Sequence, residues 1–184
     1  MERIPESFES VNHYLGSYVY PLSEETRAQI HSSMEIIWRA PFVEVISFEE
    51  SKPYGTKVYE VKVDLWRNIF RKRGKEPYKT LPGDLFILAD PKPETFSDLQ
   101  RAGQSWAFVS ITKITEDDNE DDFNCTFFKV KASKEFELNN GMQTSLFVVF
   151  LGNLTTNRRI WKALHMSRNL KVIKEVLCTG SMVR

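Results

Sequence analysis

The segment VYEVKVDLW, from Val58 to Trp66, decides the fold because its apolar and polar residues alternate. Alternation with a period of two places every second side chain on the same face of an extended strand. The residues on the apolar face are Tyr59, Val61, Val63 and Leu65. The opposite face is more polar, so we expect one side of this strand to meet a core and the other to meet water.

Five further segments have the composition of strands, being rich in β-branched and aromatic residues. They are FVEVISF (42–48), LFILA (85–89), WAFVSITKI (106–114), FFKVKA (127–132) and TSLFVVFLGNL (144–154). Short strands and turns at such regular spacing are typical of a small antiparallel barrel or sandwich. We predict a mainly β fold with flanking helices, in which a small antiparallel β-barrel of about six strands is held on a helical stalk.

Helical periodicity marks both ends of the chain. Apolar residues recur at near-helical intervals over 7–37, 155–166 and 169–177. Proline is tolerated in the first turn of a helix, so the first region is expected to hold two helices that meet at Tyr20 and Pro21.

We expect the terminal helices to pack on each other, because each carries an apolar stripe that needs a partner surface. The stripe of the first region is Leu22, Ile30, Met34 and Ile37, and the best partner that the sequence offers is Ile160, Trp161 and Leu164. The chain then divides into an N-terminal helical stalk segment (1–41), the barrel (42–154) and a C-terminal helical stalk segment (155–184), all within one compact domain.

Composition places the chain among ordinary globular proteins. Of its 184 residues, 41% are hydrophobic and 27% are charged, which suits neither disorder nor a membrane class. The longest apolar run, Leu146 to Leu151, is too short to span a membrane, and the first residues lack the apolar core of a signal peptide. We therefore expect an intracellular protein without membrane contact. Its 25 basic and 25 acidic residues balance, so any affinity for nucleic acid must be local.

The sequence carries no pattern that is typical of an enzyme. A P-loop, whose glycines and lysine cradle nucleotide phosphates, is absent. The three histidines, His13, His31 and His165, lie in separate segments, and no histidine or cysteine has zinc-finger spacing. We therefore predict no catalytic residue, no metal site and no cofactor.

The connection between the second and third predicted strands is the strongest candidate for a binding site. WRNIFRKRGKEPYK (66–79) has six basic residues, one acid and interleaved aromatic residues. Basic side chains contact phosphates and exposed rings stack on bases, so this composition suits single-stranded RNA or DNA. The candidate residues are Trp66, Arg67, Arg71, Lys72, Arg73, Lys75 and Lys79. The alternative is a solvated turn whose aromatic residues anchor it to the barrel, and the sequence favours neither.

Two other connections are distinctive. Residues 115–122 (TEDDNEDD) form a dense acidic run, which is typical of an exposed hairpin tip. Residues 91–104 have room for a short helix around 94–101. The aromatic residues inside the strand segments are predicted to be core, and they are Trp106, Phe108, Phe127, Phe147 and Phe150.

Three stretches occur in an order that is much more specific than any one of them. They are HYLGSYVYPLSEETRAQI (13–30), LPGDLFILAD (81–90) and NLTTNRRIWKAL (153–164). Together they resemble the accessory region of the senataxin-like and nonsense-decay group of superfamily 1 helicases, and most closely its plant members. The first resembles the family's stalk segment, the second the Gly-Asp-Leu turn and strand of its small barrel, and the third the stretch that leads back into the stalk.

The resemblance implies that the chain is the stalk-and-barrel module of a larger protein. That parent protein would be an ATP-dependent, 5′-to-3′ RNA or RNA/DNA helicase in the nucleus. The implied partners are single-stranded RNA or DNA, bound weakly by the isolated module, and the helicase motor domains of the same parent chain. The family's nucleotide-binding motifs are missing from this sequence. Where the family frequently has Arg-Glu after two threonines, this chain has Arg158 and Arg159, which we add to the candidate phosphate contacts.

Two other functions remain open at this point. In the first, the module is a protein-interaction domain that recruits a regulatory protein through an exposed face or through the 91–104 connection. In the second, it is an intramolecular spacer whose faces become buried against the motor domains of the parent chain. Basic residues clustered on one barrel face would favour nucleic-acid binding, whereas an exposed apolar patch elsewhere would favour a protein partner.

Overall fold

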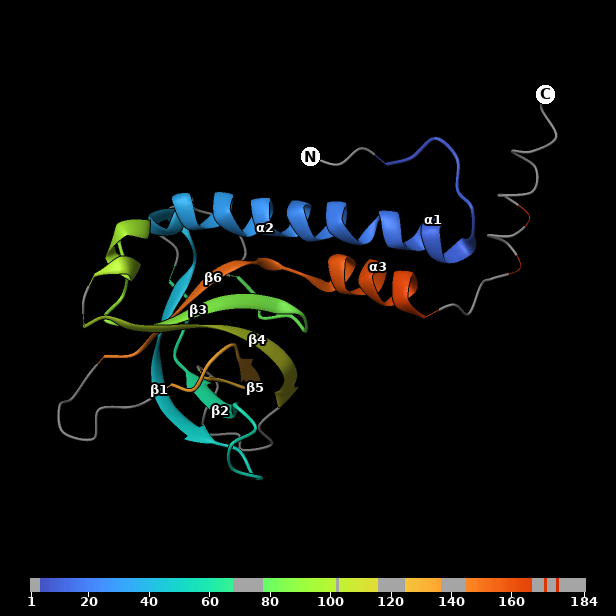
Figure 1. Cartoon of the computed structure of the whole chain (residues 1–184). Coiled ribbons are helices and arrows are strands. Elements are labelled where there is room, and N and C mark those ends of the chain that lie inside the picture. Colours follow the sequence, from blue (N-terminus) through green and yellow to red (C-terminus); the bar gives the residue numbers. More distant parts are fainter. Residues whose placement is uncertain are drawn as a thin grey trace. The chain divides into compact units, whose positions relative to one another are not determined.

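The computed structural model describes residues 4–67, 78–101, 103–115, 125–136 and 145–166, together with Lys171 and Glu175. These residues belong to two compact units, whose helices and strands are labelled in Figure 1. The first unit is built from the described residues up to Gln29 and from Thr155 onward, and the second is Ile30–Leu154. The second unit contains the six strands found among the described residues.

A closed barrel forms the centre of the second unit (Figure 1). Its strands are β1 (Phe42–Glu50), β2 (Val58–Val63), β3 (Asp84–Asp90), β4 (Ser105–Thr115), β5 (Thr126–Ala132) and β6 (Phe147–Asn153). They are hydrogen-bonded in the order β1-β2-β5-β4-β3-β6, with β6 returning to β1, and each neighbouring pair is antiparallel. Closing a sheet in this way removes its unpaired edges. The predicted antiparallel barrel of about six strands is confirmed.

Alternate residues of the strands fill the barrel interior. In β2 the predicted apolar face supplies Tyr59, Val61 and Val63, all of them buried. Leu65 was expected on the same face, but it lies beyond the end of β2 and is 58% exposed, so that part of the prediction is wrong. Past Val63 the strand alternation stops, and the larger ring of Trp66 packs against the interior in place of Leu65.

β3 is buried on both faces. Phe86 and Leu88 belong to the interior cluster, whereas Leu85, Ile87 and Ala89 belong to a second apolar cluster on the outer side of the barrel. The residues that cover this outer cluster from other segments include Met34, Ile37 and Leu99. Burial on two faces explains why this strand is an uninterrupted apolar run instead of an alternating one.

Of the five aromatic residues predicted to be core, only Phe150 packs against the interior cluster. Trp106, Phe108, Phe127 and Phe147 lie on the outer side of the barrel, because their strand neighbours take the interior positions, so this part of the prediction is wrong. Trp106 is half-buried against the outer cluster, and its indole N–H donates to the Leu99 carbonyl at 2.7 Å. Phe127 is half-buried on the outer side of β5, because its neighbour Phe128 takes the interior position. Adjacent residues of a strand point to opposite faces, so two consecutive rings cannot both enter the barrel.

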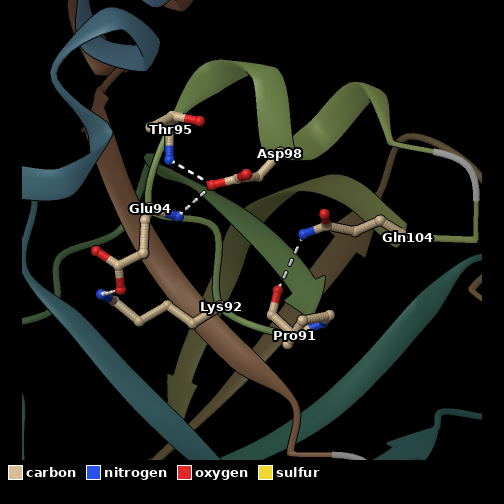
Figure 2. Close-up of polar contacts among 6 residues, drawn as sticks. All are labelled: Pro91, Lys92, Glu94, Thr95, Asp98 and Gln104. Carbon is tan, nitrogen blue, oxygen red and sulfur yellow. Dashed lines mark hydrogen bonds and ion pairs between the residues drawn. The ribbon is translucent and has the colours of Figure 1, made fainter.

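The connection from β3 to β4 is held by polar contacts (Figure 2). The helix expected here forms as a short 3-10 helix, η2 (Phe96–Gln100). The Asp98 carboxylate caps it by accepting from the backbone N–H groups of Glu94 at 2.9 Å and Thr95 at 2.7 Å. Capping satisfies amides that the helix itself leaves unpaired, and it fixes the turn that packs Leu99 onto the outer cluster.

The N-terminal region holds two helices, α1 (Val11–Ser17) and α2 (Val19–Glu35). They are separated at Tyr18, slightly before the predicted junction at Tyr20 and Pro21. Pro21 lies in the first turn of α2, where its missing N–H costs nothing. A short 3-10 helix, η1 (Ile37–Arg39), follows α2 and leads into β1.

α3 (Thr155–His165) confirms the first helix predicted after the barrel. The second, over 169–177, falls outside the described residues apart from Lys171 and Glu175. Within the first unit α3 contacts α1, and the Asn157 side-chain amide donates to the Thr26 hydroxyl of α2 at 2.8 Å. The predicted contact between the N- and C-terminal helices is thereby confirmed.

The side chains predicted to make that contact are partly wrong. Ile30, Met34 and Ile37 pack on the outer cluster of the barrel, and Ile160 and Trp161 are each 43% exposed. The physical reason lies in β3, whose apolar outer face also needs a cover. The end of α2 runs directly into the barrel and supplies that cover.

We expect truncation on either face of β3 to destabilise the second unit. Leu88→Ala in the interior and Ile87→Ala on the outer side each remove a fully buried aliphatic side chain, at a cost of about 2–5 kcal/mol in the free energy of unfolding. Ile46→Ala, at a side chain that is 53% exposed, is the control and should change it by less than about 0.5 kcal/mol. Urea unfolding followed by circular dichroism measures all three. A neutral Ile87→Ala would contradict the burial of the outer face.

Candidate nucleic-acid interface

Both ends of the basic 66–79 connection are fixed to the barrel. After β2, Arg67 pairs with Phe42 through two backbone hydrogen bonds, 2.8 Å from the Arg67 N–H and 2.9 Å to the Arg67 carbonyl. Before β3, the Asp84 N–H donates to the Leu81 carbonyl at 3.1 Å and closes a turn. The connection therefore leaves and rejoins the barrel at defined points.

Trp66 anchors the first end of this connection on the barrel interior. Its indole N–H donates to the Thr80 hydroxyl at 3.0 Å, which joins the two ends of the connection to each other. Its ring stacks on Phe86 with centroids 5.4 Å apart and meets the edge of Tyr78 at 4.6 Å. Trp66 is half-buried. These contacts agree with the alternative interpretation from the sequence, in which the aromatic residues anchor the connection.

A buried carboxylate ties the second end of the connection to two strands. Asp84, the first residue of β3, is only 1% exposed. One of its carboxylate oxygens accepts from the Tyr78 hydroxyl and from the Leu81 N–H at 2.7 Å, and the other accepts from the Asn153 amide at 2.7 Å. Burying a charged group is costly unless hydrogen bonds replace its water, and these donors do so. The connection, the turn before β3 and the end of β6 are thereby joined.

Tyr78 holds its proton more tightly than an ordinary tyrosine. Burial raises the pKa of its phenol, and the hydrogen bond to Asp84 and the negative charge of that carboxylate raise it further. If Tyr78 ionised, two negative charges would face each other in a poorly solvated place. The network therefore depends on a neutral phenol.

The predicted binding residues divide into described and undescribed ones. Arg67 and Lys79 are exposed at the two ends of the connection. Arg158 and Arg159 are exposed on α3, in the first unit. The other predicted contacts, Arg71, Lys72, Arg73 and Lys75, lie outside the described residues. The hydrogen bond from Trp66 to Thr80, the residue after Lys79, brings the two ends of the connection together.

The strand ends that flank the basic connection and those that flank the acidic run lie at the same end of the barrel. The strand order and the antiparallel pairing place the end of β2 and the start of β3 at the same end as the end of β4 and the start of β5. The segment between the first pair has six basic residues, and that between the second pair has six acidic ones. Opposite charges at one end weaken its long-range attraction for a polyanion.

Sequence reasoning missed the network of Tyr78, Asp84 and Asn153. A signal was present, because Asp84 is an acid placed between a turn and a wholly apolar strand, where a charge needs hydrogen-bond donors. Its partners come from segments that the barrel brings together from distant parts of the chain. No local pattern identifies such partners.

The fold and these contacts define the class of protein as a small closed antiparallel β-barrel, in which the basic connection between β2 and β3 is anchored at both of its ends. The whole chain, residues 1–184, matches the family described as "Domain of unknown function (DUF6469)", and it belongs to that family. No curated protein matches its sequence.

Within the described ranges, no helix has the length and apolar character needed to cross a membrane. In that same part of the chain, no group of three His, Cys, Asp or Glu side chains is arranged to hold a metal ion.

The raised pKa of Tyr78 predicts how stability responds to alkali. Its folded pKa lies above the unfolded value of about 10, so unfolding releases this proton once the pH passes about 10. The stability that depends on this proton is fully present below pH 10 and is lost as the pH rises further.

Tyr78→Phe tests this dependence by urea unfolding at a series of pH values. At neutral pH the variant should lose about 1–3 kcal/mol, because the buried Asp84 carboxylate loses a donor. Above pH 10 its stability should fall less steeply than that of the unmodified chain. Parallel pH profiles for the two proteins would contradict the assigned role of the phenol.

Proposed function

We propose that this chain is a non-catalytic module that positions single-stranded RNA or DNA beside the motor domains of an ATP-dependent helicase. The observation that supports binding is that the 66–79 connection is anchored at both ends while Arg67 and Lys79 stay exposed. Fixing both ends reduces the conformational entropy that a bound ligand has to remove. Exposed cations at those fixed points suit contacts with phosphates.

The helicase context comes from the sequence resemblance of three stretches, 13–30, 81–90 and 153–164. By that resemblance the parent protein acts on RNA or RNA/DNA in the nucleus, and this chain is its stalk and barrel. A motor that moves along a strand needs a rigid second surface to guide it, and a closed barrel is suited to that role. Because the net charge is zero, the isolated chain is expected to bind weakly.

A regulatory protein partner is the second candidate function. Ile36 and Trp38, between α2 and β1, are 53% and 40% exposed, and the Arg39 guanidinium lies 4.4 Å from the centroid of the Trp38 ring. Aromatic and arginine side chains are enriched at protein interfaces. If a regulator binds here, Trp38→Ala should abolish its capture and leave nucleic-acid binding unchanged.

The proposed lack of catalysis is tested directly by ATP turnover. The sequence has no glycine loop and lysine to hold nucleotide phosphates, so the purified chain should neither hydrolyse ATP nor unwind a duplex with it. A coupled ATPase assay after repeated purification measures this. Turnover that stays in constant proportion to the chain through each purification step would contradict the proposal.

Nucleic-acid binding predicts a measurable salt dependence. The affinity of the full chain for a labelled single-stranded oligonucleotide, followed by fluorescence anisotropy, should fall with salt at a slope of roughly −0.7 per phosphate contact, because each contact releases condensed counterion. Replacing Arg71, Lys72 and Arg73 together by Ala should flatten this slope by up to about two units, to the same extent for every base sequence.

Trp66→Ala provides the matched comparison for the triple variant. Because Trp66 packs on the barrel interior, its loss should lower the Tm and leave the salt slope of the folded protein unchanged. Binding that does not respond to salt, or no binding even at low salt, would contradict the nucleic-acid function and leave the protein-partner function standing.

A further inference from the structure

Charge is divided unevenly around the barrel wall. β1 contains three acids and no basic residue, whereas the neighbouring strands β2, β5 and β4 together contain four lysines and one acid. The lysines are Lys62, Lys113, Lys129 and Lys131, and the acid is Glu60. We refer to the outer side of these three strands as the lysine face. A chain with zero net charge thus carries a local positive surface.

The four lysines of this face point away from the barrel interior. Residues alternate between the two sides of a strand, and the strand neighbours of these lysines are interior residues. Those interior neighbours include Val61, Val63, Phe128, Val130 and Ile114. Neighbouring strands lie about 4.8 Å apart, and alternate residues of one strand lie roughly 6.6 Å apart, so the lysines form a compact array.

The arrangement of the lysines lowers the stability of the sheet. Lys113 lies directly opposite Lys129 on the neighbouring strand, and like charges in that position destabilise a sheet. Lys129 is compensated on its other side by Glu60, at 2.7 Å. Lys113 and Lys131 are exposed, and neither makes an ion pair among the residues that the structure describes.

Aromatic rings are interleaved with these cations. The Lys62 ammonium lies 4.7 Å from the centroid of the half-buried Phe127 ring. Just after β5, the Lys134 ammonium lies 5.2 Å from the centroid of the Trp106 ring on β4. Surfaces that combine cations with aromatic rings are typical of proteins that bind single-stranded nucleic acid. Lysine binds phosphate as a point charge, without the bidentate geometry with which arginine recognises both carboxylates and phosphates.

We propose that the lysine face binds the phosphate backbone of single-stranded nucleic acid, as a second contact surface distinct from the 66–79 connection. This inference rests on the proposed nucleic-acid function and adds a surface to it. A regular array of lysines matches a polymer with regularly repeated negative charges. Since the charged contacts are made to phosphates, binding should not depend on the base sequence.

The paired substitution Lys113→Gln with Lys131→Gln tests the proposal in the full chain. Both side chains are exposed, so the variant should fold normally, with a Tm that is unchanged or slightly raised because Lys113 no longer repels Lys129. With labelled oligo-dT and oligo-U probes in fluorescence anisotropy, the slope of affinity against salt should flatten by up to about 1.4 units, or roughly 0.7 for each lysine. The loss should be equal for mixed-sequence probes of the same length.

Arg27→Gln with Arg101→Gln is the matched control. It removes the same net charge at side chains that are 73% and 75% exposed and that lie outside the three strands of the lysine face. Both arginines are ion-paired, with Glu24 and Asp98, so the variant should leave the slope unchanged. An unchanged slope in the lysine variant, together with a flattened slope in the Arg71, Lys72 and Arg73 variant, would overturn the lysine face and leave the proposed function standing. No binding by the unmodified chain would overturn both. Equal, lysine-dependent binding of labelled polyglutamate would assign the face to acidic protein segments and overturn the nucleic-acid assignment.

Discussion

The burial of β3 on two faces is the constraint on which the rest of the structure depends. Phe86 and Leu88 need the barrel interior, so the sheet closes around them. Ile87 on the other face needs an outer cover, which the end of α2, η1 and η2 supply. These segments therefore pack on the side of the barrel that β3 and β6 form. The outward residues of β2 and β5 are mostly charged, so the outer surface of the barrel is divided into an apolar side and a charged side.

The first residue of the same strand organises the charged end of the barrel. Asp84 is buried, and its carboxylate accepts hydrogen bonds from Tyr78, Leu81 and Asn153. The basic connection is therefore tied to the most deeply buried strand. On the proposed function, weak local contacts of this kind suit a module attached to a motor, because attachment gives a high effective concentration of the bound strand. Strong affinity in isolation is not required for such a role.

The fold could be predicted from the sequence much better than the site. Alternation in VYEVKVDLW and the regular spacing of the other segments identified the strands, since a period of two follows from strand geometry alone. The partner of Met34 could not be predicted, because its stripe fits a helix and a sheet equally well, and the choice depends on the outer face of β3. The Asp84 network and the lysine face join residues from separate strands. Only the register places Lys113 opposite Lys129.

The central claim is that nucleic acid contacts the lysine face and the ends of the basic connection, and that the rest of the barrel wall takes no part. Titration of the isotopically labelled full chain with a short single-stranded oligonucleotide, followed by amide chemical shifts in two-dimensional NMR, tests this most directly. The account predicts shifts at Lys113, Lys129, Lys131, Arg67 and Lys79 that fade with added salt, and none at Glu49 on acidic β1. Shifts confined to the region of Ile36 and Trp38, or no shifts at low salt, would contradict it.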